Sequence, residues 1–175
     1  MNIQPEIIKA AQAAQERWNV WASVSLAQFG VESAWGRSMP RGSNNPFGIK
    51  ALPGHPSVAA ATHEEIGGRL VPMTCYFARF DSFDEAFEEH AKLLASSHYY
   101  HDAMAHAYRS GDPSAERFID GLGAYATDHN YRATLKNVAR SLNLYQYDTI
   151  SSPQGDAVLA VVTRTPIPEP RLDLL

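Results

Sequence analysis

The feature that most constrains the fold is one hairpin-like segment set among helical patterns. "AAATHEEIGGRLVPMTCYFARF" places a Gly-Gly turn between strand-like residues, so we expect a β-hairpin with strands over 62–66 and 70–80. Helical periodicity fills the ranges on both sides, at 5–17, 20–35, 81–97, 98–110, 112–123 and 130–147. The pattern predicts a mainly helical α+β chain with a small β element.

Composition places the chain among folded globular proteins of about one domain. It has 175 residues, of which 45% are hydrophobic and 19% charged. The net charge of -4, with no Lys/Arg cluster, argues against a nucleic-acid partner. No run of about 18 apolar residues occurs, so we expect no transmembrane segment. The start of the chain lacks the basic and apolar regions of a Sec signal, which predicts cytoplasmic synthesis without one.

Glu32 is a lone carboxylate at the end of an otherwise apolar helical pattern. Its side of the helix is shared by Trp21, Val24, Gln28 and Trp35, at spacings of three and four residues. One interpretation is a helix-end residue that simply reaches solvent. The other is a general acid, because a carboxyl in a pocket partly walled by Gln28 and Trp35 has a raised pKa.

A long Gly-, Pro- and Asn-rich segment follows this helix, and we expect it to form a loop. Within it, "SNNPFGIK" sets Asn44 and Asn45 beside Phe47. Paired amides can hydrogen-bond sugar hydroxyl and acetamido groups, while an aromatic ring stacks on a sugar face. The alternative is an Asn-Pro turn with an apolar anchor.

Near the last helix, "GAYATDHNYRATL" contributes Tyr125, Asp128 and Tyr131. Small residues surround Tyr125, so its hydroxyl can face a cleft. Asp128 can also act as the N-cap of the following helix.

Metal and cysteine chemistry have little support in the sequence. The histidines show no HExxH pattern, and His90 on an apolar helix face is typical of a core histidine. Cys75 lies in a strand-like run with no motif around it. We expect neither a metal nor another cofactor.

Five ordered blocks carry a family resemblance: "LAQFGVESAWG", "NNPFGIKA", the Thr62–Glu64 "T-x-E", "FARFDSFDEAFEEHAKLL" and "YATDHNYRATL". Together they resemble glycoside hydrolase family 73, the bacterial endo-β-N-acetylglucosaminidases that include flagellar-rod peptidoglycan hydrolase domains and several autolysins. The resemblance implies a lysozyme-like fold, in which a helical lobe and a small β-hairpin lobe flank a glycan groove. The resemblance covers about Val20 to Tyr145, and we expect a domain over 1–148 followed by an extended C-terminal tail over 149–175.

By the same resemblance, Glu32 is the general acid, Glu64 the second carboxylate and Tyr125 a catalytic tyrosine. The remaining candidates, expected to contact the glycan, are Gln28, Trp35, Asn44, Asn45, Phe47, Asp128 and Tyr131. The chain departs from the family pattern at Ala34 and Ala78. Glu65 stays open as an alternative to Glu64, because successive strand residues point to opposite faces and only one can face the groove.

The implied reaction is hydrolysis of the β-1,4 bond between N-acetylglucosamine and N-acetylmuramic acid in peptidoglycan. A muramidase or lytic transglycosylase of the lysozyme fold, or a non-catalytic glycan-binding module, are the alternatives. Without a Sec signal, a phage-type lysin or a secreted antibacterial effector acting on cell-wall peptidoglycan is expected. An effector would have an immunity protein as a partner.

Overall fold

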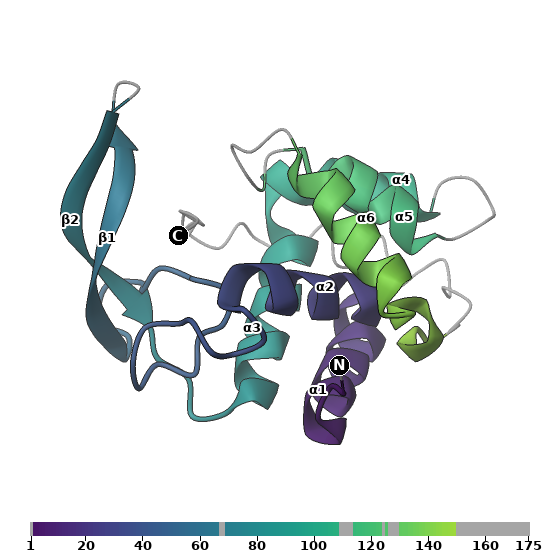
Figure 1. Cartoon of the computed structure of the whole chain (residues 1–175), viewed down its shortest axis with the longest axis horizontal. Helices are drawn as coiled ribbons and strands as arrows, with labels where there is room; N and C mark the ends of the chain where they lie inside the picture. The colour runs from purple at the N-terminus through teal and green to yellow at the C-terminus, as the bar shows by residue number, and fades with distance from the viewer. Residues whose placement is uncertain (1, 67–68, 109–113, 124, 126–129, 150–175) are drawn as a thin grey trace.

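Helices form most of the molecule, and one β-hairpin extends from them (Figure 1). The computed structural model describes residues 2–66, 69–108, 114–123, 125 and 130–149. The elements in chain order are α1 (Pro5–Trp18), α2 (Ala22–Ser33), β1 (Ser57–Ile66), β2 (Arg69–Ala78), α3 (Phe83–Ser96), the 3₁₀ turn η1 (His98–Tyr100), α4 (His101–Tyr108), α5 (Ala115–Gly121), α6 (Tyr131–Ser141) and η2 (Leu144–Tyr147). The expected mainly helical α+β fold is confirmed.

α2 is the central element of the helical lobe. Nearly every residue from Ala22 to Phe29 is buried, including the polar Ser23, Ser25 and Gln28. A helix apolar on all sides belongs in a core, and α1, α6 and η2 pack around this one. In Figure 1 its C-terminal end points toward the loop and the hairpin. The core therefore fixes the direction in which Glu32 leaves the helix.

Local signals account for several helix ends. Pro5 occupies the first position of α1, where its missing N–H is not needed. At the start of α3, the Ser82 hydroxyl accepts from the Glu85 N–H at 3.2 Å, as in the capping box that a Ser followed three residues later by Glu forms. The predicted start of α5 at Asp112 and Pro113 lies outside the described residues, and Ser114 precedes the helix as it is described.

The expectation that α2 continues to Trp35 is wrong. The helix ends at Ser33, and Ala34, Trp35 and Gly36 have positive φ angles of 48°, 64° and 78°. The Ser33 hydroxyl donates to the Phe29 carbonyl at 2.6 Å and accepts from the Gly36 N–H at 2.9 Å. This hydroxyl satisfies backbone groups on both sides of the turn, so it stabilises the early end.

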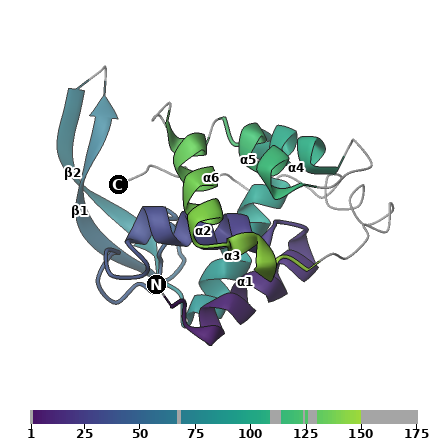
Figure 2. The ribbon, with the colours of Figure 1, turned by 45° about the vertical axis from the view of Figure 1, so that its right-hand side comes forward.

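The hairpin is an antiparallel pair with β1 Ser57 opposite β2 Ala78 and Ile66 opposite Arg69. Its first strand begins at Ser57 rather than Thr62, because the small residues 59–61, a weak strand signal, pair with 74–76. Figures 1 and 2 show that the hairpin meets the rest of the molecule only near its base. There Phe77 is fully buried.

The last described residues return to the start of the chain. Gln12 donates its amide to the Tyr147 carbonyl at 2.9 Å, and the Ser23 N–H and hydroxyl donate to Asp148 at 2.7 and 2.8 Å. These contacts tie the last described residues to α1 and α2. The extended tail stays a prediction, since 150–175 lie outside the described residues.

Candidate active site

Glu32 lies in the last turn of α2 and receives a hydrogen bond from a residue 99 positions away. The Tyr131 hydroxyl, at the first residue of α6, donates to Glu32 Oε1 at 2.5 Å. The Gln28 amide, one turn before Glu32, donates to the same hydroxyl at 3.1 Å. Gln28 and Tyr131 therefore hold the carboxyl from one side in a fixed geometry.

Burial dominates the electrostatics of this carboxyl. It raises the pKa of Glu32 from its ordinary 4.5 to about 7, and the hydrogen bond from Tyr131 opposes the shift. A group with a pKa near 7 is half protonated at neutral pH. Such a carboxyl can donate a proton to a leaving oxygen, as general acid catalysis requires.

Tyr125 lies directly behind Tyr131. The two rings stack with centroids 5.3 Å apart and an interplanar angle of 8°. The side chain of Tyr125 is 1% exposed, and its hydroxyl lies 3.5 Å from His90 Nε2 rather than facing an open cleft, which corrects the sequence expectation. Burial, followed by the charge of Glu32, raises the pKa of Tyr125 well above 10, so this phenol is neutral.

Trp35 folds back onto α2 and packs against Phe29 and Gly30, which precede Glu32 on that helix. Its indole meets Phe29 edge-on, with centroids 6.0 Å apart, and a Cβ placed on Gly30 would lie 2.4 Å from the ring. The absence of a side chain at position 30 thus lets the indole approach the helix. Trp35 is half-buried, so part of it stays accessible.

Two expected sugar contacts, Asn45 and Phe47, have buried structural positions instead. The Asn45 amide donates to the Ile49 and Ala78 carbonyls at 2.8 and 2.9 Å and accepts from the Ile49 N–H at 3.0 Å. Phe47 is 1% exposed. The Asn-Pro turn with an apolar anchor is therefore what the structure contains. Buried backbone groups at the hairpin base need these partners.

Asn44 differs from its neighbour because it stays half-buried. Its amide donates to the Phe80 carbonyl at 3.0 Å, and its φ of 49° places it in the left-handed region that Asn tolerates. Among the described candidates, only Glu32, Trp35 and Asn44 keep partly exposed side chains.

Glu64 and Glu65, the two candidates for the second carboxylate, lie in β1, where the structure gives the backbone register. Glu64 pairs with Val71, and Glu65 with Leu70. The side chains of both glutamates, and all of Asp128, lie outside what the structure describes. Their roles stay predictions.

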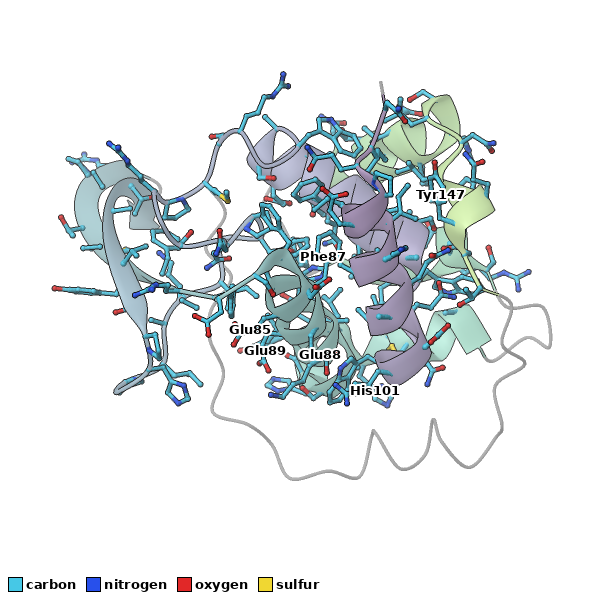
Figure 3. All side chains as sticks on the ribbon, turned by 90° about the horizontal axis from the view of Figure 1, so that it is seen from below. Glu85, Phe87, Glu88, Glu89, His101 and Tyr147 are labelled. Carbon is cyan, nitrogen blue, oxygen red and sulfur yellow. The ribbon has the colours of Figure 1, made fainter. Side chains whose placement is uncertain are left out.

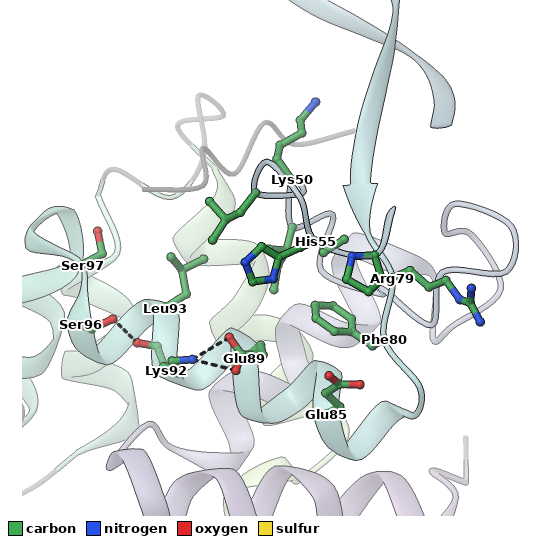
Figure 4. Close-up of a pocket in the computed structure, with 14 residues that line it drawn as sticks. Lys50, His55, Arg79, Phe80, Glu85, Glu89, Lys92, Leu93, Ser96 and Ser97 are labelled. Atoms are coloured by element: carbon green, nitrogen blue, oxygen red, sulfur yellow. Dashed lines mark hydrogen bonds and ion pairs between the residues drawn. The ribbon is translucent and has the colours of Figure 1, made fainter. Parts of the chain in front are cut away.

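A separate pocket of about 510 Å³ lies between the hairpin base and α3 (Figure 4). It is lined by Ile49, Lys50, Leu52, His55, Pro56, Ala78, Arg79, Phe80, Glu85, Glu89, Lys92, Leu93, Ser96 and Ser97. Glu32 is not part of this lining. On α3, Glu85 and Glu89 face this pocket, Glu88 accepts from Trp18 and Arg17 of α1, and Phe87 is buried in the core (Figure 3).

Sequence reasoning predicted Tyr131 as a glycan contact, whereas the structure buries it against Glu32, and it treated His90 as ordinary core. The only available signal was a polar residue on the apolar face of α3.

Among the described residues, no group of three His, Cys, Asp or Glu side chains could hold a metal ion. No helix in that part of the chain is both long and apolar enough to cross a bilayer.

The fold and this acid-bearing helix end define a glycoside hydrolase domain of the lysozyme-like type. Residues 8–144 match the glucosaminidase family, described as mannosyl-glycoprotein endo-β-N-acetylglucosaminidase. The chain belongs to this family, glycoside hydrolase family 73, as the resemblance implied.

Two curated relatives and one solved structure illustrate the relationship. An autolysin of Enterococcus faecalis is 36% identical over 84% of this chain and 21% of its own length. The peptidoglycan hydrolase FlgJ of Pseudomonas aeruginosa is 32% identical over 80% of this chain and 36% of its own. The catalytic domain of the Listeria monocytogenes autolysin Auto superposes with a TM-score of 0.72 at 31% identity, covering 82% of this chain and 84% of that domain. The chain thus spans about a fifth and about a third of these two curated relatives.

Proposed function

We propose that this chain is a peptidoglycan hydrolase that cleaves the β-1,4 bond between N-acetylglucosamine and N-acetylmuramic acid, leaving N-acetylglucosamine at the reducing end. The observation that carries the proposal is the Glu32 carboxyl, held by Tyr131 at 2.5 Å with a pKa of about 7 at the end of a buried helix. Membership of the glucosaminidase family and the names of the relatives, autolysin and peptidoglycan hydrolase, support this substrate.

In this mechanism protonated Glu32 donates its proton to the glycosidic oxygen as the bond to the anomeric carbon breaks. The transition state resembles an oxocarbenium ion. Glu32 becomes a carboxylate in the same step, and the Tyr131 O–H then donates to a charged acceptor. Such charge-assisted bonds are about twice as strong as neutral ones, so Tyr131 favours the transition state.

Glu64 is the second carboxylate of the proposal. In the hairpin register Glu64 falls on the same strand face as Thr62 and Ala60, which are buried and half-buried. Glu65 falls on the face of Ala61 and Ala59, which are exposed. Continuing the less exposed face favours Glu64.

Three routes remain open for the second half of the reaction. Glu64 can activate water, giving inversion at a carboxyl separation of roughly 6.5–9.5 Å, or act at shorter range as a nucleophile, giving retention. In the third route the acetamido group of the substrate attacks. Tyr125 would then act through Tyr131, because its own hydroxyl is buried.

The test is product analysis on purified peptidoglycan. Digests are reduced with borohydride and the muropeptides are separated by mass. The expected new reducing end is N-acetylglucosamine. New reducing N-acetylmuramic acid would identify a muramidase and an anhydro sugar a lytic transglycosylase. Sugar binding without new reducing ends would identify a glycan-binding module.

We further propose that the protein acts on the peptidoglycan of the cell wall. A phage-type lysin or a secreted antibacterial effector, the latter with an immunity protein as partner, stays the prediction made from the sequence. The genes flanking this one test it. A holin gene favours a lysin, and a secretion component with an immunity gene favours an effector.

A further inference from the structure

His90 is an unusual residue at the centre of the helical lobe. It projects from α3, is 0% exposed and stacks on Phe47, with ring centroids 3.9 Å apart at 13°. Its Nδ1 has no hydrogen-bond partner among the described residues. Buried polar atoms without partners are rare in proteins, so each one needs an explanation.

The other ring nitrogen suggests the explanation. His90 Nε2 lies 3.5 Å from the Tyr125 hydroxyl, a long but possible hydrogen bond. A neutral imidazole carries its proton on one nitrogen only. A proton on Nδ1 would bury an N–H donor with no acceptor, whereas a proton on Nε2 leaves only a lone pair unused. Orphaned buried N–H groups are the rarer case, so the Nε2–H tautomer is favoured.

This tautomer sets the direction of the polar groups that follow. With Nε2–H donating to the Tyr125 oxygen, the Tyr125 hydroxyl proton is left to turn toward Tyr131, whose ring stacks on that of Tyr125 with centroids 5.3 Å apart. The Tyr131 proton is already committed to Glu32 Oε1. Each donor then points toward the carboxyl of Glu32.

We propose that His90 is a positioning residue for the hydrolysis, whose Nε2–H orders Tyr125 and Tyr131 so that their hydroxyl protons all point toward Glu32. The inference rests on the proposed role of Glu32 as general acid. No proton moves between His90, Tyr125, Tyr131 and Glu32. The only proton transferred passes from Glu32 to the leaving oxygen, and the ordered hydroxyls stabilise the carboxylate that forms. Hydrogen bonds in series polarise and strengthen one another.

Among the described residues that line up from His90 to Glu32, the group whose pKa lies near neutral pH is Glu32. Tyr131 faces it from α6, Tyr125 from the segment before α6, and His90 from α3, while Tyr100 of η1 contacts Tyr125. Burial lowers the pKa of His90 to about 3 and raises those of Tyr125 and Tyr131 well above 10. A shift in the alkaline limb of activity therefore reports on Glu32.

The first experiment compares His90→Met with His90→Gln by pH profiles of peptidoglycan hydrolysis. Met fills a similar volume without an N–H, while the Gln amide can place one near the Nε2 position. For His90→Met we expect the alkaline limb to move up by about 0.5–1 pH unit, because losing a hydrogen bond of about 1 kcal/mol weakens the stabilisation of the Glu32 carboxylate. The maximal rate should fall about five- to tenfold. His90→Gln should return the alkaline limb to its original position and restore the maximal rate to within about twofold.

Phe87→Leu is the matched control. Phe87 is also buried on α3 and packs against Phe47, with centroids 5.0 Å apart, but it has no polar atom. It should lower the Tm while leaving the alkaline limb in place. An unmoved limb in folded His90→Met, or an equal move in Phe87→Leu, would overturn the proposal.

A second measurement on the unmodified protein does not depend on how the variants fold or on activity. Long-range ¹H–¹⁵N NMR identifies the histidine tautomer, and ¹³C titration reports the pKa of Glu32. We expect neutral His90 with its proton on Nε2 between pH 5 and 8. A proton on Nδ1, or a charged ring in that range, would overturn the inference even if hydrolysis is confirmed. The Nε2–H tautomer in a protein without hydrolase activity would fault the proposed function instead.

Discussion

The helical lobe and the hairpin position their candidate carboxylates by different means. Glu32 leaves a helix that is buried almost all around, and a hydrogen bond from α6 holds it. Glu64 lies in a two-stranded ladder that meets the core only at its base, where Phe77 is buried, while Val71, Met73 and Tyr76 are exposed. Packing of the helices thus sets the pKa of Glu32, whereas backbone pairing of β1 with β2 sets the position of Glu64. An isolated hairpin is only marginally stable, so the anchor at its base matters most.

The comparison is tested most strongly at the acid itself. Glu32→Gln should lower the rate of reducing-end release from peptidoglycan by about 10²–10⁴-fold, because the amide cannot donate the catalytic proton. Far-UV circular dichroism should show an unchanged fold. Near-normal activity in a folded variant would remove Glu32 from its role.

At the hairpin, Glu64→Gln and Glu65→Gln should have unequal effects. We expect a rate loss of about 10²-fold or more for Glu64→Gln, and less than about threefold for Glu65→Gln, because only one strand face can meet the glycan. Initial rates of both variants on the same peptidoglycan batch measure the difference. The reverse ranking would move the second carboxylate to Glu65.

The packed surroundings of Glu32 also predict a pH-dependent cost to stability. Below pH 4.5 the carboxyl is protonated in both the folded and unfolded states and contributes no difference. Between pH 4.5 and about 7 the carboxyl ionises in the unfolded chain but stays protonated in the folded one, so the free energy of unfolding falls as the pH rises. The decrease reaches about 3 kcal/mol and is complete above pH 7. Glu32→Gln should therefore gain more in Tm over the unmodified protein at pH 8 than at pH 5. An equal gain at both values would contradict the raised pKa.

The anchor of the hairpin is tested at Asn45. Asn45→Ala removes three hydrogen bonds to Ile49 and Ala78 and should lower the free energy of unfolding by about 2–4 kcal/mol. Urea unfolding measures the loss. Asn44→Gly is the control, since it removes one hydrogen bond, to Phe80, while Gly accepts the positive φ of this position, and it should cost about 1 kcal/mol. Equal losses would mean that the hairpin base does not depend on Asn45.

The smallest expected effect concerns the contact between α2 and the indole. Gly30→Ala places a Cβ 2.4 Å from the Trp35 ring and should cost about 1–3 kcal/mol, with a change in tryptophan fluorescence. Gly123→Ala, where the Cβ meets nothing within 4 Å, should change neither. If Gly30→Ala leaves the fluorescence unchanged, the position of Trp35 does not depend on this contact.

The sequence predicted the secondary-structure elements, which interactions between residues close in the chain control. Helical periodicity, the Ser82 capping box and the Gly-Gly turn give the elements and their order, because hydrogen bonds and side-chain contacts within a few residues set them. Glu32 could be singled out because a lone carboxylate in an apolar run is costly to bury. The sequence did not predict the last residue of α2. The helix ends at Ser33 because the Ser33 hydroxyl hydrogen-bonds two backbone groups, and no sequence pattern indicates this contact.

Only the tertiary structure decided which side chains meet. Asn44 and Asn45 are adjacent and chemically identical, yet one is half-buried and the other fully buried at the hairpin base. Tyr131 reaches Glu32 across 99 positions, and His90 reaches Tyr125 across 35. Such contacts depend on how whole helices pack, which local patterns do not encode. The sequence by itself therefore singled out Glu32 and determined the elements around it, while packing between distant segments determined the hydrogen-bond partners of Glu32 and its pKa.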